Sequence, residues 1–170
     1  MVAAGAAGLL GVGCAAAGPG AERGMAMADR VDSETEVHAV LDDFHAAAAA
    51  ADGARYFAHF APDGVFVGTD ATERWDVAAF RAYAAPHFEA GRGWAYRSVE
   101  RHVRVATGDA VAWFDERLRN DAYGDVRGSG VLRRIDGAWR IEQYVLSFPI
   151  PNDVAREVVE RIRLHGGERP

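Results

Sequence analysis

The stretch TGDAVAWFDERLRNDAYGDVRGSGVLRRIDGAWRIEQYVLS, residues 107–147, decides the fold. Runs rich in Val, Trp, Tyr, Phe and Ile alternate in it with turn residues, and Asp136-Gly137 between two such runs is the strongest short signal for a hairpin. With the run that precedes it, the stretch predicts four strands joined by three hairpins, at residues 94–106, 110–121, 126–135 and 138–148. We therefore expect an antiparallel meander.

The predicted strands are long, about 10–12 residues against a usual length of about 5–6, so the sheet should twist and bend strongly. Gly128 and Gly130 lie inside the third strand and are expected to mark the bend or a bulge. A strongly bent sheet has a concave face that amphipathic helices can cover.

Three helices are predicted upstream of the meander. Residues 34–51 carry apolar side chains at helical spacing, after Asp32 or Ser33 as a helix cap. A short helix is expected around residues 54–60, ended by Pro62. A third should run from Val77 to about Phe88, with Asp76 as its cap and Pro86 kinking or ending it early.

These elements predict an α+β fold, with a brief strand at residues 65–67 between the second and third helices. The N-terminal helices should pack into the concave face of the bent antiparallel sheet and form a cone around a small internal pocket. This domain is expected over residues 31–150, followed by a C-terminal helix and tail at 151–170. Asn152 should cap that last helix, and Gly166-Gly167 should end it.

Composition excludes several classes of partner. The chain of 170 residues has 25 acidic and 19 basic side chains, a net charge of −6, and no basic cluster with interleaved aromatics, so we expect no nucleic-acid partner. Its single cysteine, Cys14, allows neither an internal disulfide nor a thiolate metal site, and the six histidines form neither H-x-H nor H-E-x-x-H. We expect no metal and no cofactor.

Residues 1–30 are expected to lie outside the fold, as a disordered or signal-like segment. The uncharged run at residues 2–17 is too short to span a bilayer and suits the apolar region of a secretory signal. The residues up to Cys14 loosely resemble a bacterial lipoprotein signal, which predicts an exported protein, periplasmic or anchored to a membrane by a lipid on Cys14. Alternatively, translation starts at Met25 or Met27 and the protein is cytoplasmic.

Four local patterns, within residues 34–150, resemble the SnoaL-like group of the nuclear transport factor 2-like superfamily, whose fold is a cystatin-like roll. They are Gly68-Thr69-Asp70 with Glu73-Arg74-Trp75, Ala112-Trp113-Phe114-Asp115-Glu116, Arg127-Gly128-Ser129-Gly130-Val131, and Trp139-Arg140-Ile141 continuing to Ser147. The resemblance implies a pocket for a small molecule, but not one reaction, because the superfamily holds isomerases, dehydratases and cyclases beside proteins that bind ligands or assemble.

Two functions therefore stay open. One is acid-base catalysis without a cofactor, of isomerase, lyase or cyclase type, on a small apolar substrate. The alternative is a non-catalytic module for ligand binding or dimerisation. We also expect a homodimer, because aromatic and aliphatic residues remain on the sheet after the helices cover one face.

Asp115 and Glu116 are the first candidates for catalysis, because they lie in mid-strand among apolar residues. Adjacent strand residues point to opposite faces, so one of the two should face the pocket. The resemblance favours Glu116, which we expect to titrate above a free glutamate because burial opposes ionisation. A salt bridge to Arg101 or Arg133 is the structural alternative. His45, at the edge of the first helix's apolar stripe, is the third candidate, as a general base or as a hydrogen-bonded boundary residue.

Ligand contacts are expected from two groups of residues. The first is the loop after the first strand, at the mouth of the cone, with Asp70 and Trp75. The second consists of aromatic and polar residues of the predicted sheet, Trp94, Tyr96, Phe114, Gln143 and Tyr144. Gln143 is included because it shares strand parity with Trp139 and Ile141, which should point inward.

Overall fold

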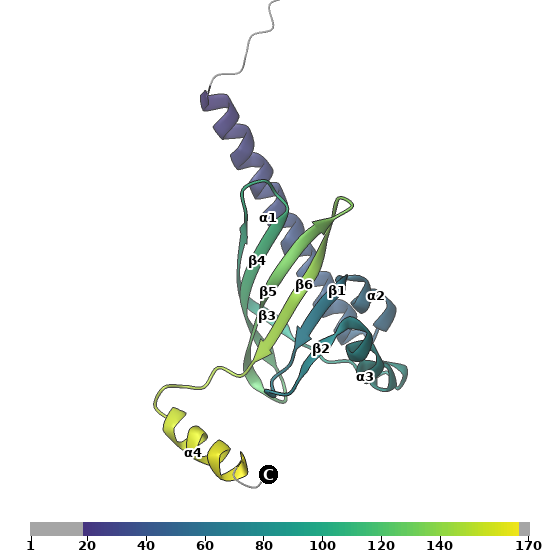
Figure 1. The fold of residues 1–170 in the computed structure, drawn as a ribbon, viewed down its shortest axis with the longest axis vertical. Coiled ribbons are helices and arrows are strands. Elements are labelled where there is room, and N and C mark those ends of the chain that lie inside the picture. Colours follow the sequence, from purple (N-terminus) through teal and green to yellow (C-terminus); the bar gives the residue numbers. More distant parts are fainter. Residues whose placement is uncertain (1–18, 167–170) are drawn as a thin grey trace, which may run out of the picture.

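A computed structural model describes residues 19–166 of the chain, and the side chains of residues 31–165. In chain order its elements are α1 (Pro19–Ala49), α2 (Gly53–Ala58), β1 (Phe60–Val67), β2 (Arg74–Asp76), α3 (Val77–Glu89), β3 (Arg97–Val105), β4 (Val111–Asn120), β5 (Gly124–Ile135), β6 (Ala138–Ser147) and α4 (Ala155–Gly166). One bent sheet holds all six strands, in the order β2-β1-β6-β5-β4-β3. Helix α1 runs along one face of this sheet, and α2 and α3 lie beside β1 and β2 (Figure 1). The predicted α+β architecture is thus confirmed.

The meander of β3 to β6 is confirmed, with antiparallel pairing throughout. The hairpin between β5 and β6 closes with Ile135 opposite Ala138, which leaves Asp136 and Gly137 as a two-residue turn. Both have positive φ, 49° and 79°, as a type I′ turn requires. Local turn chemistry therefore sets the register of this hairpin.

A bulge in β6 changes which of its side chains face inward. Val131 pairs with Gln143, whereas the next residue, Leu132, pairs with Ile141. The extra residue in β6 shifts the alternation by one, so Ile141 and Tyr144 are both buried and Gln143 is exposed. The prediction that Gln143 faces the pocket is therefore wrong.

Several predicted boundaries also need correction. Helix α1 begins at Pro19, so Ser33 lies inside the helix instead of capping it; the buried Ser33 hydroxyl accepts a hydrogen bond from Arg134 at 3.1 Å. Helix α2 ends at Ala58, before Pro62, which lies in the irregularly paired part of β1. Strand β2 forms where the sequence predicts a loop.

Pro86 does not end α3 early, because the helix continues to Glu89. The helix buries Phe80, Ala84 and Phe88 on one side. Packing of that apolar side outweighs the hydrogen bond that proline removes near the helix end.

The predicted cap of α3 is present, and it gives a first test of the fold. The Asp76 carboxylate accepts a hydrogen bond from the backbone N–H of Ala79 at 2.8 Å. We expect Asp76→Ala to lower the free energy of unfolding by about 1 kcal/mol, because the N–H loses its partner. Asp76→Asn keeps an oxygen in place and should cost much less. Urea denaturation of both variants measures the difference, and equal costs would contradict the capping role.

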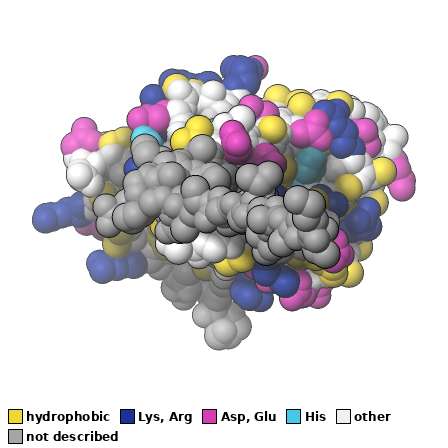
Figure 2. All heavy atoms as spheres, turned by 90° about the horizontal axis from the view of Figure 1, so that it is seen from above, with side chains coloured by type: hydrophobic (Ala, Val, Ile, Leu, Met, Phe, Trp, Pro, Cys, Tyr) yellow, Lys and Arg dark blue, Asp and Glu magenta, His cyan; other side chains and the backbone are white. Residues whose placement is uncertain are grey.

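Arginines and acids are interspersed on the face of the molecule seen in Figure 2. Val99, Val111 and Trp113 are exposed on the sheet, and the homodimer stays a prediction. No helix within the described residues is long and apolar enough to cross a membrane. Cys14 and the predicted export signal lie outside the described residues.

Candidate active site and ligand pocket

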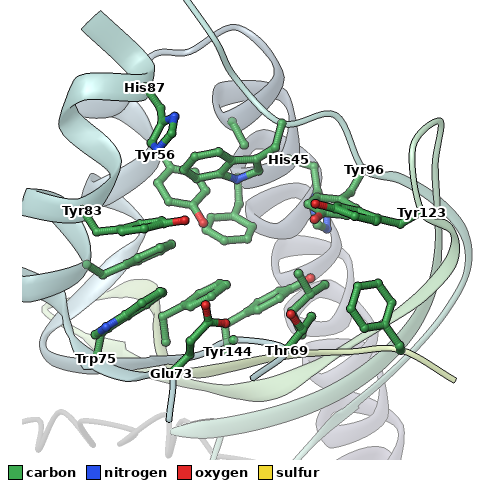
Figure 3. A pocket seen from close by; sticks show the side chains of 18 residues that line it. His45, Tyr56, Thr69, Glu73, Trp75, Tyr83, His87, Tyr96, Tyr123 and Tyr144 are labelled. Atoms are coloured by element: carbon green, nitrogen blue, oxygen red, sulfur yellow. The ribbon is translucent and has the colours of Figure 1, made fainter. Parts of the chain in front are cut away.

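A pocket of about 290 Å³ opens between the helices and the concave face of the sheet. This volume is near the lower end of the range for small-molecule sites, about 300–1,000 Å³. The residues that line it are mostly aromatic: Phe44, His45, Ala48, Tyr56, Phe66, Gly68, Thr69, Glu73, Trp75, Phe80, Tyr83, His87, Trp94, Tyr96, Tyr123, Tyr144, Leu146 and Phe148. Figure 3 shows these side chains around the open space.

Five of the lining rings stand nearly parallel. Phe66 lies 1° from the plane of Tyr144 and 14° from that of Phe80. Trp75 continues the series, 9° from Phe80 and 25° from Tyr83. These rings stack on one another, with neighbouring centroids 4.1 to 5.8 Å apart, and form an aromatic wall against which a flat ligand can lie.

Glu116 lies directly behind this pocket, almost completely buried at 1% exposure. Its Oε1 accepts hydrogen bonds from the hydroxyl of Tyr144 at 3.0 Å and pairs with Nε2 of His45 at 2.8 Å. Its Oε2 accepts from Nε of Arg101, also at 2.8 Å. Arg101 is the residue opposite Glu116 in the β3–β4 register, and its guanidinium continues to Asp42 on α1 at 2.8 Å.

The expected raised titration of Glu116 is wrong. Burial does raise the pKa of this carboxyl, but the hydrogen bond from His45 and the charge and hydrogen bond of Arg101 outweigh it, so the pKa lies below the ordinary 4.5. The prediction failed because it assumed burial without a fixed cation, and Arg101 supplies one. Glu116 is therefore an ionised carboxylate at neutral pH and a poor proton acceptor. Glu116 instead forms the salt bridge to Arg101, one of the two structural alternatives considered for it.

Gly128 makes room for this network. It lies opposite Glu116 in the β4–β5 register, and a Cβ on it would lie 2.3 Å from the hydroxyl of Tyr144 and 2.9 Å from Oε1 of Glu116. Neither distance is tolerable for nonbonded atoms. The site therefore requires glycine at position 128. This requirement is separate from any effect of the glycine on the bend of the strand.

His45 connects the buried carboxylate to the pocket. An ionised carboxylate only accepts hydrogen bonds, so Nε2 of His45 donates to Glu116. In the neutral ring this leaves Nδ1 as a lone-pair acceptor, and no described residue hydrogen-bonds to it. His45 is 7% exposed and lines the pocket, so Nδ1 is the nitrogen available to a ligand.

Tyr144 and Tyr96 add hydroxyl groups to the pocket lining. Burial raises the pKa of Tyr144 well above its usual value, and the neighbouring Glu116 carboxylate raises it further. Burial also raises the pKa of Tyr96, which is half-buried. Both phenols therefore stay protonated and act as hydrogen-bond donors at neutral pH.

Among the other predicted site residues, Trp75 and Trp94 line the pocket. Phe114 is buried beneath it, with its ring 5.7 Å from that of Tyr144. Asp70 does not line it: its carboxylate accepts hydrogen bonds from the backbone and hydroxyl of Thr72 and shapes the loop. Gln143 is exposed and points away from the pocket.

Asp115 is the catalytic candidate that the structure places elsewhere. Its side chain is 65% exposed on the outer face of the sheet, 3.4 Å from His102. Strand alternation is the reason, because its neighbour Glu116 takes the inward position. Asp115 therefore lies on the face of the sheet opposite the pocket and cannot act on a ligand inside it.

Sequence reasoning missed most of the aromatic wall, including Tyr56, Phe66, Phe80 and Tyr83. Their apolar character predicted only a core, and the parallel pairing of β1 with β6, which places Phe66 beside Tyr144, is nonlocal. Among the described residues, no group of three or more His, Cys, Asp or Glu side chains is arranged to hold a metal ion.

Comparisons with known proteins agree with this fold. Residues 37–151 match the family model of the SnoaL-like domain. No curated protein sequence matches the chain significantly.

Several solved structures are similar. An NTF2-like protein of unknown function from Pseudomonas putida KT2440 has a TM-score of 0.62 at 17% identity, covering 73% of this chain and 92% of that one. A ketosteroid isomerase-like protein from Erwinia carotovora atroseptica has 0.52 at 22% identity, covering 69% and 97%. A protein of unknown function with a cystatin-like fold from Nostoc punctiforme has 0.54 at 17%, covering 66% and 88%.

At these identities the solved structures show the fold alone. The family model, in contrast, spans more than half of the sequence. The chain therefore belongs to the SnoaL-like domain family, with the fold of nuclear transport factor 2-like proteins.

Proposed function

We propose that this domain binds a small, flat and largely apolar molecule and transfers a proton on it without a cofactor, in an isomerase, lyase or cyclase type of reaction. The observation that carries the proposal is the series Arg101, Glu116 and His45, which leads from a buried cation through a carboxylate to a histidine on the pocket wall. The similarity to a ketosteroid isomerase-like protein supports it at the level of the fold.

His45 is the proton acceptor in this proposal, in place of Glu116. A carboxylate whose pKa is held down by a guanidinium has little tendency to take a proton. The same carboxylate orients the imidazole of His45 and stabilises the imidazolium that forms when Nδ1 takes a proton from the substrate. Glu116 is thus a positioning residue, and His45 is the catalytic one.

The substrate suited to this arrangement has a C–H bond next to a carbonyl group. When Nδ1 of His45 removes that proton, negative charge develops on the carbonyl oxygen and needs a hydrogen-bond donor. Tyr96 lies on the same side of the pocket as His45 (Figure 3), and its hydroxyl stays protonated. We assign the donor role to Tyr96.

Hydrogen exchange tests the proposal without knowledge of the natural substrate. β-Tetralone is a bicyclic ketone with acidic hydrogens beside its carbonyl, and the protein should accelerate their replacement by deuterium in D₂O, as followed by NMR. Tetralin has a similar shape and no carbonyl, so it should compete and slow the exchange. Exchange at the buffer rate, with β-tetralone bound, would contradict the catalytic proposal and leave the non-catalytic binding module as the function.

A further inference from the structure

Glu73 is a carboxylate on the pocket wall that the proposed proton transfer does not use. It belongs to the loop between β1 and β2 and is half-buried. Figure 3 shows its carboxylate directed into the cavity, beside Thr69 and Tyr144 and on a different side from His45. No ion pair within the described residues involves it.

The loop holds Glu73 in this position through its own backbone. Its carbonyl accepts a hydrogen bond from the N–H of Gly68 at 2.8 Å, and its N–H donates to the carbonyl of Asp70 at 2.9 Å. The carboxylate oxygen Oε2 accepts from the N–H of Asp70 at 3.2 Å, which leaves Oε1 for a ligand.

The position of the Glu73 carboxylate depends on the lack of a side chain at Gly68. A Cβ on Gly68 would lie 2.2 Å from Oε2 and 2.9 Å from Cβ of Glu73. The backbone of Gly68 is not in the left-handed region, so conformation alone does not require glycine there. Glycine is needed because any side chain would displace Glu73.

The charges around the pocket point to one class of ligand. Among the described lining residues there is one carboxylate, that of Glu73, and no arginine, and the chain contains no lysine. The rings of Trp75, Tyr83 and Tyr123 line the same cavity, and the face of an aromatic ring is electron-rich. An anion would meet a carboxylate with no arginine or lysine beside it among the described lining residues, whereas a cation would gain an ion pair and contacts with aromatic faces.

We propose that the natural ligand is a flat aromatic or polycyclic molecule with a positively charged amino group, and that Glu73 binds this amino group. The inference rests on the ligand pocket of the proposed function and adds the charge of the ligand. The amino group lies at the Glu73 side of the pocket, and the part of the ligand that exchanges a proton lies at His45.

Three probes of one shape and different charge test this inference: naphthylmethylamine, naphthylmethanol and naphthylacetate. Their affinities are measured by calorimetry at about pH 8, where an alkylamine is protonated and an ordinary histidine is neutral. We expect the amine to bind about tenfold more tightly than the alcohol, from the ion pair and the aromatic contacts together, and the acetate to bind most weakly. Added salt should reduce the advantage of the amine.

Two variants locate the effect. Glu73→Gln keeps the size of the side chain and should bring the amine and the alcohol to within about twofold of each other, without changing the affinity for the alcohol. Gly68→Ala keeps the charge but displaces the carboxylate, so it should reduce the preference as well. Glu89→Gln, an exposed change outside the pocket lining, is the matched control and should leave all three affinities unchanged.

The inference fails if the alcohol or the acetate binds as well as the amine, if none of the three probes binds, or if Glu73→Gln keeps the preference. These affinities do not depend on turnover. Preference for the amine without exchange of β-tetralone would therefore refute the proton transfer and leave the charge of the ligand established.

Discussion

Replacing His45 by Gln is expected to slow the exchange of β-tetralone by at least about a hundredfold, the lower end of what a positioned acid-base group contributes. Glutamine has an amide N–H₂ that can still donate to Glu116, so the buried carboxylate keeps a partner. It has no nitrogen that takes up a proton at ordinary pH. The loss should therefore appear in the exchange rate, while tetralin binds to the variant as it does to the wild type.

His102 provides the matched control for this prediction. It lies on the outer face of the sheet, with a side chain that is 61% exposed, beside Asp115. His102→Gln makes the same chemical change outside the pocket and should leave the exchange rate within about twofold of the wild type. A His45→Gln variant that retains more than a tenth of the wild-type rate would move the base to another residue.

The meander could be predicted because its information is local. Each hairpin turn is encoded by two or three consecutive residues, of which Asp136-Gly137 is the clearest, and each strand by its own apolar content. The helix boundaries were less accurate. Packing of Phe80, Ala84 and Phe88 keeps α3 helical past Pro86, and Ser33 inside α1 binds Arg134; a rule for isolated helices does not include these contacts.

The site was only partly predictable for the same reason. Strand parity gave two alternatives, Asp115 or Glu116, and two salt-bridge partners were considered, Arg101 and Arg133. Which of them forms depends on the register of β3 against β4, which places Arg101 opposite Glu116, while Arg133 pairs with Glu142. The bulge in β6 turned Gln143 outward, and no residue in that strand signals it.

The buried ion pair of Arg101 and Glu116 is the basis of the second prediction, a large loss of stability. Glu116→Gln should lower the free energy of unfolding by about 3–5 kcal/mol, because it leaves the guanidinium of Arg101 buried without its main counter-charge. Asp42 compensates little, since its carboxylate is 70% exposed while the Arg101 side chain is 5% exposed. One nitrogen of Arg101, Nη2, is already buried without a partner among the described residues.

Two further variants test whether the loss of stability comes from the Arg101–Glu116 pair or from any substitution in this strand. Asp115→Asn changes the neighbouring exposed acid and should stay within about 0.5 kcal/mol of the wild type. In Arg101→Met combined with Glu116→Gln, the buried cation is absent as well. This double variant should lose less stability than the two single changes added together, with a coupling of about 0.5–3 kcal/mol. Additive losses in urea denaturation would show that the two side chains do not stabilise the fold as a pair.

The dependence on pH follows from the lowered pKa of Glu116. A carboxyl whose pKa is lower in the folded state than in the unfolded state stabilises the fold fully above the ordinary value, 4.5 here, and loses this contribution as the pH falls through the folded value. The wild type should therefore lose stability below about pH 4.5 in a way that the Glu116→Gln variant does not, because glutamine has no proton to bind. The gap in unfolding free energy between the two proteins should narrow from neutral pH to about pH 3. A gap that stays constant over that interval would mean that Glu116 is not held ionised by Arg101 and His45, and the orientation of His45 by a carboxylate would lose its basis.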